Sequence, residues 1–393
     1  MAEDAFIRVH VFDVGFGDSI LLEFPENKWG VIDCNYGFNS PNNDPPVLSY
    51  LKSKNVNNLE FICLTHPHLD HFQGLWKVCK YYSEEGRTYK YFLDLTLSFI
   101  DIAKINYRGN SFASNELYKL HNYSHELIKK SYKERYKSQI IIWRPIYSDF
   151  RPKPFLDLYN ILCFYAAPNP VVVNEIKEKM KNGDPFSPNK VCMAIFLQIN
   201  EDKNKSSIIL LSGDLEKAEW EKAFDELRVQ RHMTLIPCDF VKVGHHGGTS
   251  ANPEWLWSRI THRKNGERKS FAVISTSGQE GHPSPDVLNA ILSNKVILFC
   301  TRKGPQCIPL DDPLPKKSYF ENNIIELMRE SKKERKKKEQ AIRMIKKVMQ
   351  MKKKLNRECS GNISFEIKSL GEVAVIHQDR AISCLYMDQV WNP

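Results

Sequence analysis

The segment Thr65–His71 (THPHLDH) constrains this chain more than any other part of its sequence. It ends the apolar, partly β-branched run Leu59–Thr65, which predicts a strand, so its polar side chains are expected where that strand ends. Imidazole and carboxylate groups are ligands that Zn²⁺ and Mn²⁺ accept. A solvated, histidine-rich turn is the simpler alternative, but four ligand-type residues within six positions favour a metal loop. The segment therefore predicts two adjacent metal sites with the ligands His66, His68, Asp70 and His71.

Upstream of this loop, the chain places carboxylates and glycines at the ends of further predicted strands. Phe6–Phe12 alternates between apolar and polar residues, as a half-buried strand does. It leads into Asp13–Ser19 (DVGFGDS), where two glycines permit a tight loop close to a site. Ser19–Phe24 and Trp29–Asp33 predict the next two strands, and Asp33 ends the second of them.

Downstream, three more strands are each followed by residues able to bind metal or transfer protons. Ser206–Ser212 runs into Gly213 and Asp214, and Asp239–Ser250 (DFVKVGHHGGTS) carries His245 and His246. Phe271–Ser275 predicts a strand before Gly281–Pro285 (GHPSP), which places His282 just ahead of a helix that should begin near Pro285.

The H-x-H-x-D-H pattern at residues 66–71 resembles the signature of the metallo-β-lactamase superfamily. Together with D-V-G-x-G-D-S, G-D-L-E, K-V-G-H-H-G and G-H-P-S-P, it is similar to the ComEC-type branch, named for the hydrolase domain of the bacterial DNA-uptake protein. The resemblance covers roughly residues 5–301, with a short return at Gly361–Val375. It implies the α/β class, as an αββα sandwich that holds one or two metals at one edge and activates a bridging water.

The resemblance also implies roles for single residues. Asp214 would bridge both metals, while Asp18 and Asp33 would support the metal loop. The second metal would take Asp70, His71, Asp214 and one late histidine, either His282 or His245, and the order of the motifs favours His282. Asp70 is then expected in the catalytic machinery, and His245 or His246 would be placed to protonate a leaving group.

One position departs from the superfamily pattern. The third histidine of the first metal normally precedes the bridging aspartate, but Asn189–Leu197 (NKVCMAIFL) contains none. Asn189 stands where the ComEC-type branch commonly has Asn, and it either adds a carbonyl oxygen to the first metal or is only a turn residue before a strand. A site poorer in imidazole and richer in oxygen favours Mn²⁺ over Zn²⁺. The expected cofactors are two divalent ions, Zn²⁺ or Mn²⁺.

The composition is ordinary for a soluble globular protein, and no membrane segment is expected. The 393 residues include 42% hydrophobic and 26% charged residues, and no apolar run approaches the roughly 18 residues that cross a bilayer. Met1–Asp4 leads directly into a strand, so a stand-alone, cytoplasmic protein with no membrane partner is expected. The ten cysteines show no C-x-x-C spacing, which favours buried free thiols in a reducing compartment.

Three regions are expected along the chain: a hydrolase domain at 1–301 with an insertion at 81–138, a Lys/Arg-rich helical insertion at 302–358, and closing strands at 359–393. The insertion at 81–138 interleaves tyrosines with lysines and arginines, a pattern that suits stacking on single-stranded bases but also occurs on half-buried helices. The strands at Leu298–Thr301 and Ile363–Ile367, on either side of the basic insertion, are expected to be neighbours.

The net charge of +9 is unevenly distributed. Arg329–Arg357 holds fourteen Lys/Arg and three Glu, a local charge of +11, so the rest of the chain is slightly acidic. Apolar residues recur there at helical spacing, which predicts a long basic C-terminal helix. It is either a solvated face, a polyanion-binding element or a docking site for a partner protein. The predicted nucleic-acid contacts are Lys336, Lys337, Lys338, Lys346, Lys347, Lys352 and Lys353.

These observations predict a metal-dependent phosphodiesterase or nuclease that cuts DNA with a metal-activated water. Stand-alone relatives in the ComEC-type branch resemble effectors of bacterial antiviral defence, so a regulatory partner protein is also expected. Two alternatives stay open. One is hydrolysis of a small phosphodiester such as a cyclic nucleotide or a phosphocholine-type substrate. The other is a nucleic-acid or partner-binding module whose metal site is inactive.

Overall fold

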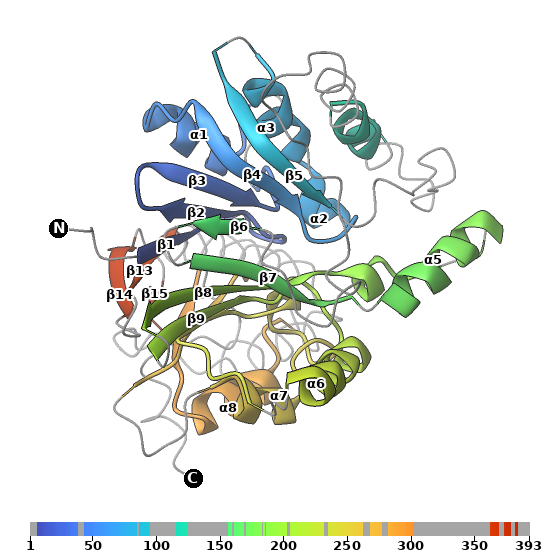
Figure 1. The fold of residues 1–393 in the computed structure, drawn as a ribbon, viewed down its shortest axis with the longest axis vertical. Helices are drawn as coiled ribbons and strands as arrows, with labels where there is room; N and C mark the ends of the chain where they lie inside the picture. The colour runs from blue at the N-terminus through green and yellow to red at the C-terminus, as the bar shows by residue number, and fades with distance from the viewer. Residues whose placement is uncertain are drawn as a thin grey trace, which may run out of the picture.

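Two mixed β-sheets pack face to face, with helices on both outer faces (Figure 1). The computed structural model describes residues 6–37, 43–84, 86–94, 115–123, 156–158, 161–168, 170–182, 184, 186–202, 205–231, 235–261, 268–276, 282–301, 362–368, 373–378 and 382–383. The predicted α/β class and αββα sandwich are confirmed. The basic helix expected at Arg329–Arg357 lies outside the described residues.

The first sheet has seven strands in the order β14-β13-β1-β2-β3-β4-β5. Strands β14 to β3 pair antiparallel, whereas β3, β4 and β5 are parallel. Their bounds are β1 Phe6–Val11, β2 Ile20–Phe24, β3 Lys28–Ile32, β4 Asn58–Leu64, β5 Thr88–Asp94, β13 Ile363–Lys368 and β14 Val373–Gln378.

The second sheet has eight strands in the order β15-β12-β11-β10-β9-β8-β7-β6. Strands β9 to β12 form its parallel centre, and the remaining pairs are antiparallel. Their bounds are β6 Leu156–Leu158, β7 Ile161–Ala167, β8 Ala194–Asp202, β9 Lys205–Leu211, β10 Phe240–Lys242, β11 Phe271–Ile274, β12 Ile297–Cys300 and β15 Ile382–Ser383.

The alternation of the strand sequences builds the core between the sheets. In β1, Ile7, Val9 and Val11 point inward and are fully buried, each contributing roughly 1.5–3 kcal/mol of burial free energy. Across the interface, the ring of Phe365 in β13 lies 4.8 Å from that of Phe240 in β10. The inward faces of the two sheets therefore form one continuous core.

The outer faces are covered by helices that begin soon after the strands they follow. Helices α1 (Pro46–Ser53) and α3 (Leu75–Tyr82) and the helical residues 115–123 pack on the first sheet. Helices α6 (Lys217–Arg231), α7 (Glu254–Ile260) and α8 (Pro285–Ser293) pack on the second sheet. Pro285 occupies the first turn of α8, where proline is favoured because no amide donor is needed.

The parallel strands bring the predicted site residues to one end of the sandwich. Asp33 follows β3, Thr65–His71 follows β4, Asp214 follows β9, and the two histidines 245 and 246 follow β10. Because the carboxyl ends of parallel strands share one edge, loops far apart in sequence meet there.

Two details differ from the sequence expectations. Strands β12 and β13 belong to different sheets, so they are not hydrogen-bonded neighbours; they face each other across the core, with the Phe299 and Phe365 rings 5.3 Å apart. Residues 88–94, expected in the insertion at 81–138, form β5, which pairs with β4 in the main sheet. Tyr89 accordingly lies in the core rather than on a binding surface.

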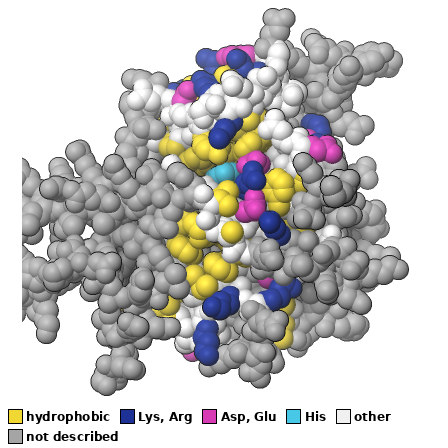
Figure 2. All heavy atoms as spheres, turned by 90° about the vertical axis from the view of Figure 1, so that its left-hand side faces the viewer, with side chains coloured by type: hydrophobic (Ala, Val, Ile, Leu, Met, Phe, Trp, Pro, Cys, Tyr) yellow, Lys and Arg dark blue, Asp and Glu magenta, His cyan; other side chains and the backbone are white. Residues whose placement is uncertain are grey.

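Several surface and compositional expectations can be compared with the described residues. The seven described cysteines are all buried, and none of them is part of a disulfide bond. None of the described helices combines the length and apolar character that a bilayer crossing needs. Figure 2 shows the face at the left of Figure 1, where basic and acidic side chains are mixed around a histidine. In β1, Arg8 pairs with Glu23 at 2.7 Å and with Glu366 at 2.8 Å, so its charge is compensated.

Candidate metal centre

The loop after β4 turns tightly into the short helix α2 (Leu69–Phe72). The backbone amide of His68 donates to the carbonyl of His66 at 2.9 Å, and that of His71 donates to the carbonyl of His68 at 2.9 Å. These turns bury His66 and His71 completely and leave the His68 side chain 40% exposed. The four predicted ligands of this loop therefore face one small volume, with His68 nearest to solvent.

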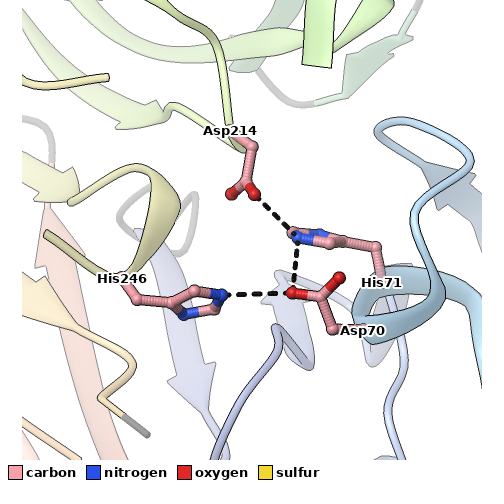
Figure 3. A group of neighbouring side chains, drawn as sticks. All are labelled: Asp70, His71, Asp214 and His246. Carbon is pink, nitrogen blue, oxygen red and sulfur yellow. Dashed lines mark hydrogen bonds and ion pairs between the residues drawn. The ribbon is translucent and has the colours of Figure 1, made fainter. Parts of the chain in front are cut away.

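Two groups of potential ligands meet at Asp214. The first group comprises His66, His68 and Asp214, and the second comprises Asp70, His71, Asp214 and His246, drawn in Figure 3. In each group, one ligand atom from every residue lies within 4.8 Å of the others. Asp214 belongs to both groups, which is the position of a carboxylate that bridges two ions.

Unpartnered polar atoms show that these residues fit divalent metals. Nε2 of His66, Nδ1 of His68, Nε2 of His71 and Oδ2 of Asp214 are all buried and lack a hydrogen-bond partner. Asp214 Oδ2 lies 3.5 Å from His71 Nε2 and 3.9 Å from His66 Nε2. Such spacings are too long for hydrogen bonds but suit ligands that each lie about 2.0–2.2 Å from a shared ion. Leaving these groups without partners would be costly, so a cation explains them best.

A hydrogen-bond chain orients the histidines of both groups. Asp33 accepts the Thr65 hydroxyl at 2.7 Å and the Nδ1–H of His71 at 2.7 Å. Because Thr65 has donated its only hydroxyl proton, its oxygen accepts Nδ1–H from His66 at 3.1 Å. The proton on Nδ1 leaves Nε2 of both histidines free to bind metal.

His246 reaches the second group through unusual backbone geometry. It belongs to the short turn η4 (His245–Gly247) and has a left-handed φ of 53°. Its Nδ1–H donates to the carbonyl of Ser275 at 2.9 Å, which points Nε2 toward Asp70 Oδ2 at 3.2 Å. The side chain is fully buried. His246 thus has the orientation of a metal ligand.

The other two late histidines lie beside this cluster. His245 is 22% exposed, its Nε2 is 3.9 Å from Asp214 Oδ2, and its Nδ1 is 3.2 Å from the Ser250 hydroxyl. Its ring stacks with His282 at a centroid distance of 6.0 Å. Among the described residues, the ligand groups include neither of these two side chains. A role for His282 or His245 in the second metal site stays a prediction, as does protonation of a leaving group by His245.

A buried ion pair connects the two sheets beneath the site. Lys242, at the end of β10, lies 2.8 Å from Asp18 Oδ1, and both side chains are 1% exposed. The amide of Asp18 in turn donates to the carbonyl of Asp70 at 3.2 Å. Asp18 and Asp33 also lie close to His71. Asp18 already pairs with Lys242, and Asp33 accepts a hydrogen bond from His71. These contacts are with the metal loop and with Lys242, so the two carboxylates do not make a third metal site, and their supporting role stays a prediction.

Asn189 lies in η3 (Pro188–Val191), just ahead of β8. Its Nδ2 donates to Glu216 at 3.3 Å, while its buried Oδ1 has no partner. The two interpretations of Asn189 both stay open. Close by in the chain, the Cys192 sulfur accepts the amide of Asp214 at 2.9 Å and so helps to fix the shared carboxylate.

The electrostatics of the site favour a positive charge within the cluster. Burial lowers the pKa of His66 well below its usual value. Burial acts in the same direction on His71, but the carboxylates of Asp214, Asp70 and Asp33 outweigh it and raise the pKa of His71 well above its usual value. Although burial opposes their ionisation, His71 holds the pKa of both Asp70 and Asp214 below the usual range. A divalent cation can take the place of this proton.

Several supporting residues have no individual signal in the sequence. Thr65, Cys192 and Lys242 lie within predicted strands or motifs, and the carbonyl of Ser275 has no side-chain signal. His246 was expected as an acid rather than as a ligand. The adjacency of Thr65 to His66 was the one available hint. The predicted lysine contacts, from Lys336 to Lys353, lie outside the described residues.

The site can be compared with known proteins. Residues 12–90 match the family model of the metallo-beta-lactamase superfamily. This segment contains the loop 13–19, Asp33 and the whole metal loop, and the two-sheet sandwich is the fold expected for that superfamily. None of the curated proteins matches the chain.

Three solved structures are similar in outline. The metallo-beta-lactamase fold protein YhfI from Bacillus subtilis has 13% identity and a TM-score of 0.39, covering 77% of this chain and 98% of its own. A diphosphatase from the PhnP family has 9% identity and a TM-score of 0.37, covering 75% and 94%. Unliganded yeast PDE1 has 12% identity and a TM-score of 0.37, covering 76% and 97%. At this similarity, the reaction of this chain must be argued from its own residues.

Proposed function

We propose that this protein is a metal-dependent hydrolase of the metallo-β-lactamase superfamily, ComEC-type branch, that cleaves phosphodiester bonds. The observation that carries the proposal is the meeting of two ligand groups at the unpartnered, buried Oδ2 of Asp214. A structural metal site would normally be closed by four protein ligands, whereas the first group offers only three. The first group would thus leave a coordination position open for water or substrate, as a catalytic centre requires.

The residues divide the chemical tasks between them. His66, His68 and Asp214 would hold one ion, and Asp70, His71, Asp214 and His246 the other. Two divalent ions bound there would supply a hydroxide nucleophile near neutral pH and neutralise charge that develops on the phosphoryl oxygens. His245 lies at the partly exposed edge of the cluster, where it can donate a proton to the leaving oxygen.

The ligand set favours Mn²⁺ as well as Zn²⁺. The first group has one carboxylate with two imidazoles, and the second has two carboxylates with two imidazoles. Each group holds more oxygen than a three-histidine site does, and oxygen ligands suit Mn²⁺. Metal titration followed by elemental analysis tests the count and the preference.

The proposed substrate is a nucleic acid, most simply DNA, and the proposed setting is antiviral defence with a regulatory partner. The support for a polyanion is the +11 charge of Arg329–Arg357 in the sequence. Clustered Lys and Arg gain affinity by releasing counterions from nucleic acid. The ComEC-type motifs support DNA over RNA.

A metal-supplemented assay on single- and double-stranded DNA and RNA tests the activity. Wild type with Mn²⁺ should cut at least one DNA substrate, while His68→Ala and Asp70→Ala should be inactive yet retain the melting behaviour of a folded protein. Hydrolysis of a cyclic nucleotide or a phosphocholine ester, with every nucleic acid left intact, would replace the nuclease proposal with the small-substrate one. Absence of all hydrolysis and of bound metal would refute the proposed chemistry.

The basic segment can be tested separately. Exchange of the seven predicted lysines for glutamine keeps the chain length and removes seven charges. If these lysines bind DNA phosphates, the affinity for DNA should fall in the variant. The slope of log affinity against log salt concentration should become shallower by about 0.9 per lost phosphate contact on duplex DNA. Cleavage of bis-(4-nitrophenyl) phosphate should change little, because this small substrate contacts only the metal centre. Unchanged affinity and salt slope would assign the segment to solvent or to a partner protein.

A further inference from the structure

Phe16 is a large aromatic side chain kept at the surface beside the metal centre. It is 40% exposed, and its ring centroid lies 4.5 Å from that of His246, with 40° between the ring planes. His246 itself is buried within the second ligand group. The exposed part of the Phe16 ring therefore lies one ring away from the position proposed for the ions.

The sequence around Phe16 separates this side chain from the core. Val14, two residues earlier, is 3% exposed and packs with Phe12 under the helices of the first sheet. Phe16 belongs to none of the described hydrophobic clusters. Full burial of a phenylalanine would stabilise the fold, so its exposure is not explained by packing of the described core.

The loop that presents Phe16 is fixed against the metal loop. The Asn35 side-chain amide donates to the carbonyl of Phe16 at 3.0 Å and to the carbonyl of Asp70 at 3.1 Å. Gly17 has a φ of 127°, and a Cβ there would lie 2.3 Å from the Asp70 carbonyl oxygen. Only glycine fits this close approach. The position of Phe16 relative to Asp70 is thus set before any substrate arrives, which lowers the entropy lost on binding.

We propose that Phe16 is a substrate-binding residue whose ring stacks on a nucleobase next to the scissile phosphate. This inference rests on the proposed phosphodiester hydrolysis and narrows its substrate to one with a base beside the reacting bond. An exposed aromatic ring beside a phosphate-binding centre is the arrangement by which proteins hold single-stranded nucleic acid without reading its sequence. A quaternary ammonium headgroup fits less well, because two divalent ions beside the ring would repel it.

Equilibrium binding separates base stacking from phosphate binding. The probes are a fluorescently labelled four-nucleotide oligothymidylate and an abasic oligonucleotide of the same length, which has the same phosphates without bases. Binding is measured by fluorescence anisotropy with Ca²⁺ as the added metal. Recovery of intact probe afterwards checks that the probe was not cut during the measurement. Phe16→Ala should weaken oligothymidylate binding by roughly 5- to 150-fold, the range expected for loss of one stacked base, and leave abasic binding within about twofold.

Two further variants distinguish stacking from simple apolar contact. Phe16→Trp keeps a π face and should retain oligothymidylate affinity, whereas Phe16→Leu keeps apolar volume and should resemble Phe16→Ala. Equal weakening of both probes by Phe16→Ala would show that the ring only supports His246 and would overturn the proposal. Unchanged binding of both probes would overturn it as well.

A kinetic comparison keeps this inference distinct from the proposed activity. With thymidine 5′-(4-nitrophenyl phosphate), Phe16→Ala should raise KM and leave kcat nearly unchanged, while methyl 4-nitrophenyl phosphate should show no change in either. Wild-type hydrolysis of both esters with no response to Phe16→Ala would refute the stacking role and leave the proposed function intact. Wild type inactive on both esters, with oligothymidylate still bound through Phe16, would refute the hydrolase and leave the stacking role.

Discussion

The two halves of the metal centre are built differently. The half from the first sheet comes from one loop, in which four potential ligands lie within six residues. Thr65 of this loop and Asp33, which follows β3, orient the imidazoles. The half from the second sheet combines single residues from separate strand ends. Asp214 follows β9, and His246 follows β10 in a left-handed conformation and is oriented by a carbonyl beyond β11. The first half is thus specified by local sequence, and the second depends on the arrangement of the whole sheet.

Asp214→Ala tests the one side chain that both ligand groups share. We expect loss of both ions and a fall in kcat/KM of at least about a thousandfold, because a catalytic metal supplies several kcal/mol of transition-state stabilisation. His68→Ala is the matched control, since it affects only the first group. Elemental analysis of both variants measures the difference. Equal metal content in Asp214→Ala and wild type would refute the bridging role.

Lys242→Met tests the ion pair that connects the halves. Removal of the cation leaves the carboxylate of Asp18 buried without its partner, so the free energy of unfolding should fall by about 3–5 kcal/mol. Chemical denaturation of the metal-free protein measures this change. In the double variant Asp18→Asn/Lys242→Met, no buried charge is left without a partner, so much of the lost free energy of unfolding should be restored. Additive losses in the double variant would show that the two residues act independently.

His246→Ala and His282→Ala decide which late histidine completes the second group. The structure groups His246 with Asp70, so its loss should weaken the more labile ion by at least about 10- to 100-fold, as loss of even an indirect metal-site residue does. His282→Ala should leave metal affinity nearly unchanged. Competition with a fluorescent chelator measures both. The opposite ranking would restore the assignment to His282 that motif order favours.

The uncertain choice of the late histidine marks the limit of what the sequence predicts. The strands were predictable because each core strand alternates or is uniformly apolar, and the ends of β4 and β9 carried recognisable ligand residues. Spacing could not choose among His245, His246 and His282, because that choice depends on left-handed backbone angles and on the carbonyl of Ser275. The sequence also could not predict which strands belong to the same sheet. Strands β12 and β13 are consecutive in the described chain yet lie in opposite sheets.

Thr65→Val sharpens the comparison within the first half. The exchange keeps the shape of the side chain but removes the hydroxyl that joins His66 to Asp33, so His66 loses the acceptor that fixes its Nδ1 proton. We expect about tenfold weaker metal binding, the low end of the range for residues that orient ligands. Thr65→Ser retains the hydroxyl and should bind metal as wild type does. Equal weakening in the serine variant would show that the methyl group, and not the hydrogen bond, is responsible.

The pH dependence of the metal-free protein should be the smallest effect. The pKa of His71 is raised well above its ordinary value of about 6.5, because Asp214, Asp70 and Asp33 outweigh the opposing effect of burial. A group whose folded-state pKa is raised contributes stability that is fully present below its unfolded pKa and is lost as pH rises through the folded value. When a chelator keeps the protein free of metal, its melting temperature should therefore fall by a few degrees as pH rises above about 6.5.

Added Mn²⁺ should cancel this trend. The ion replaces the His71 proton, so the stability that Mn²⁺ adds grows as pH rises and offsets the decline. The metal-loaded protein should therefore show little pH dependence above about 6.5. Thermal unfolding in chelator and in Mn²⁺ across this range measures both slopes. His71→Gln, which cannot carry the proton, should lose the decline seen in chelator. A decline of equal size in His71→Gln would mean that the carboxylates of the two halves are neutralised by a group other than His71.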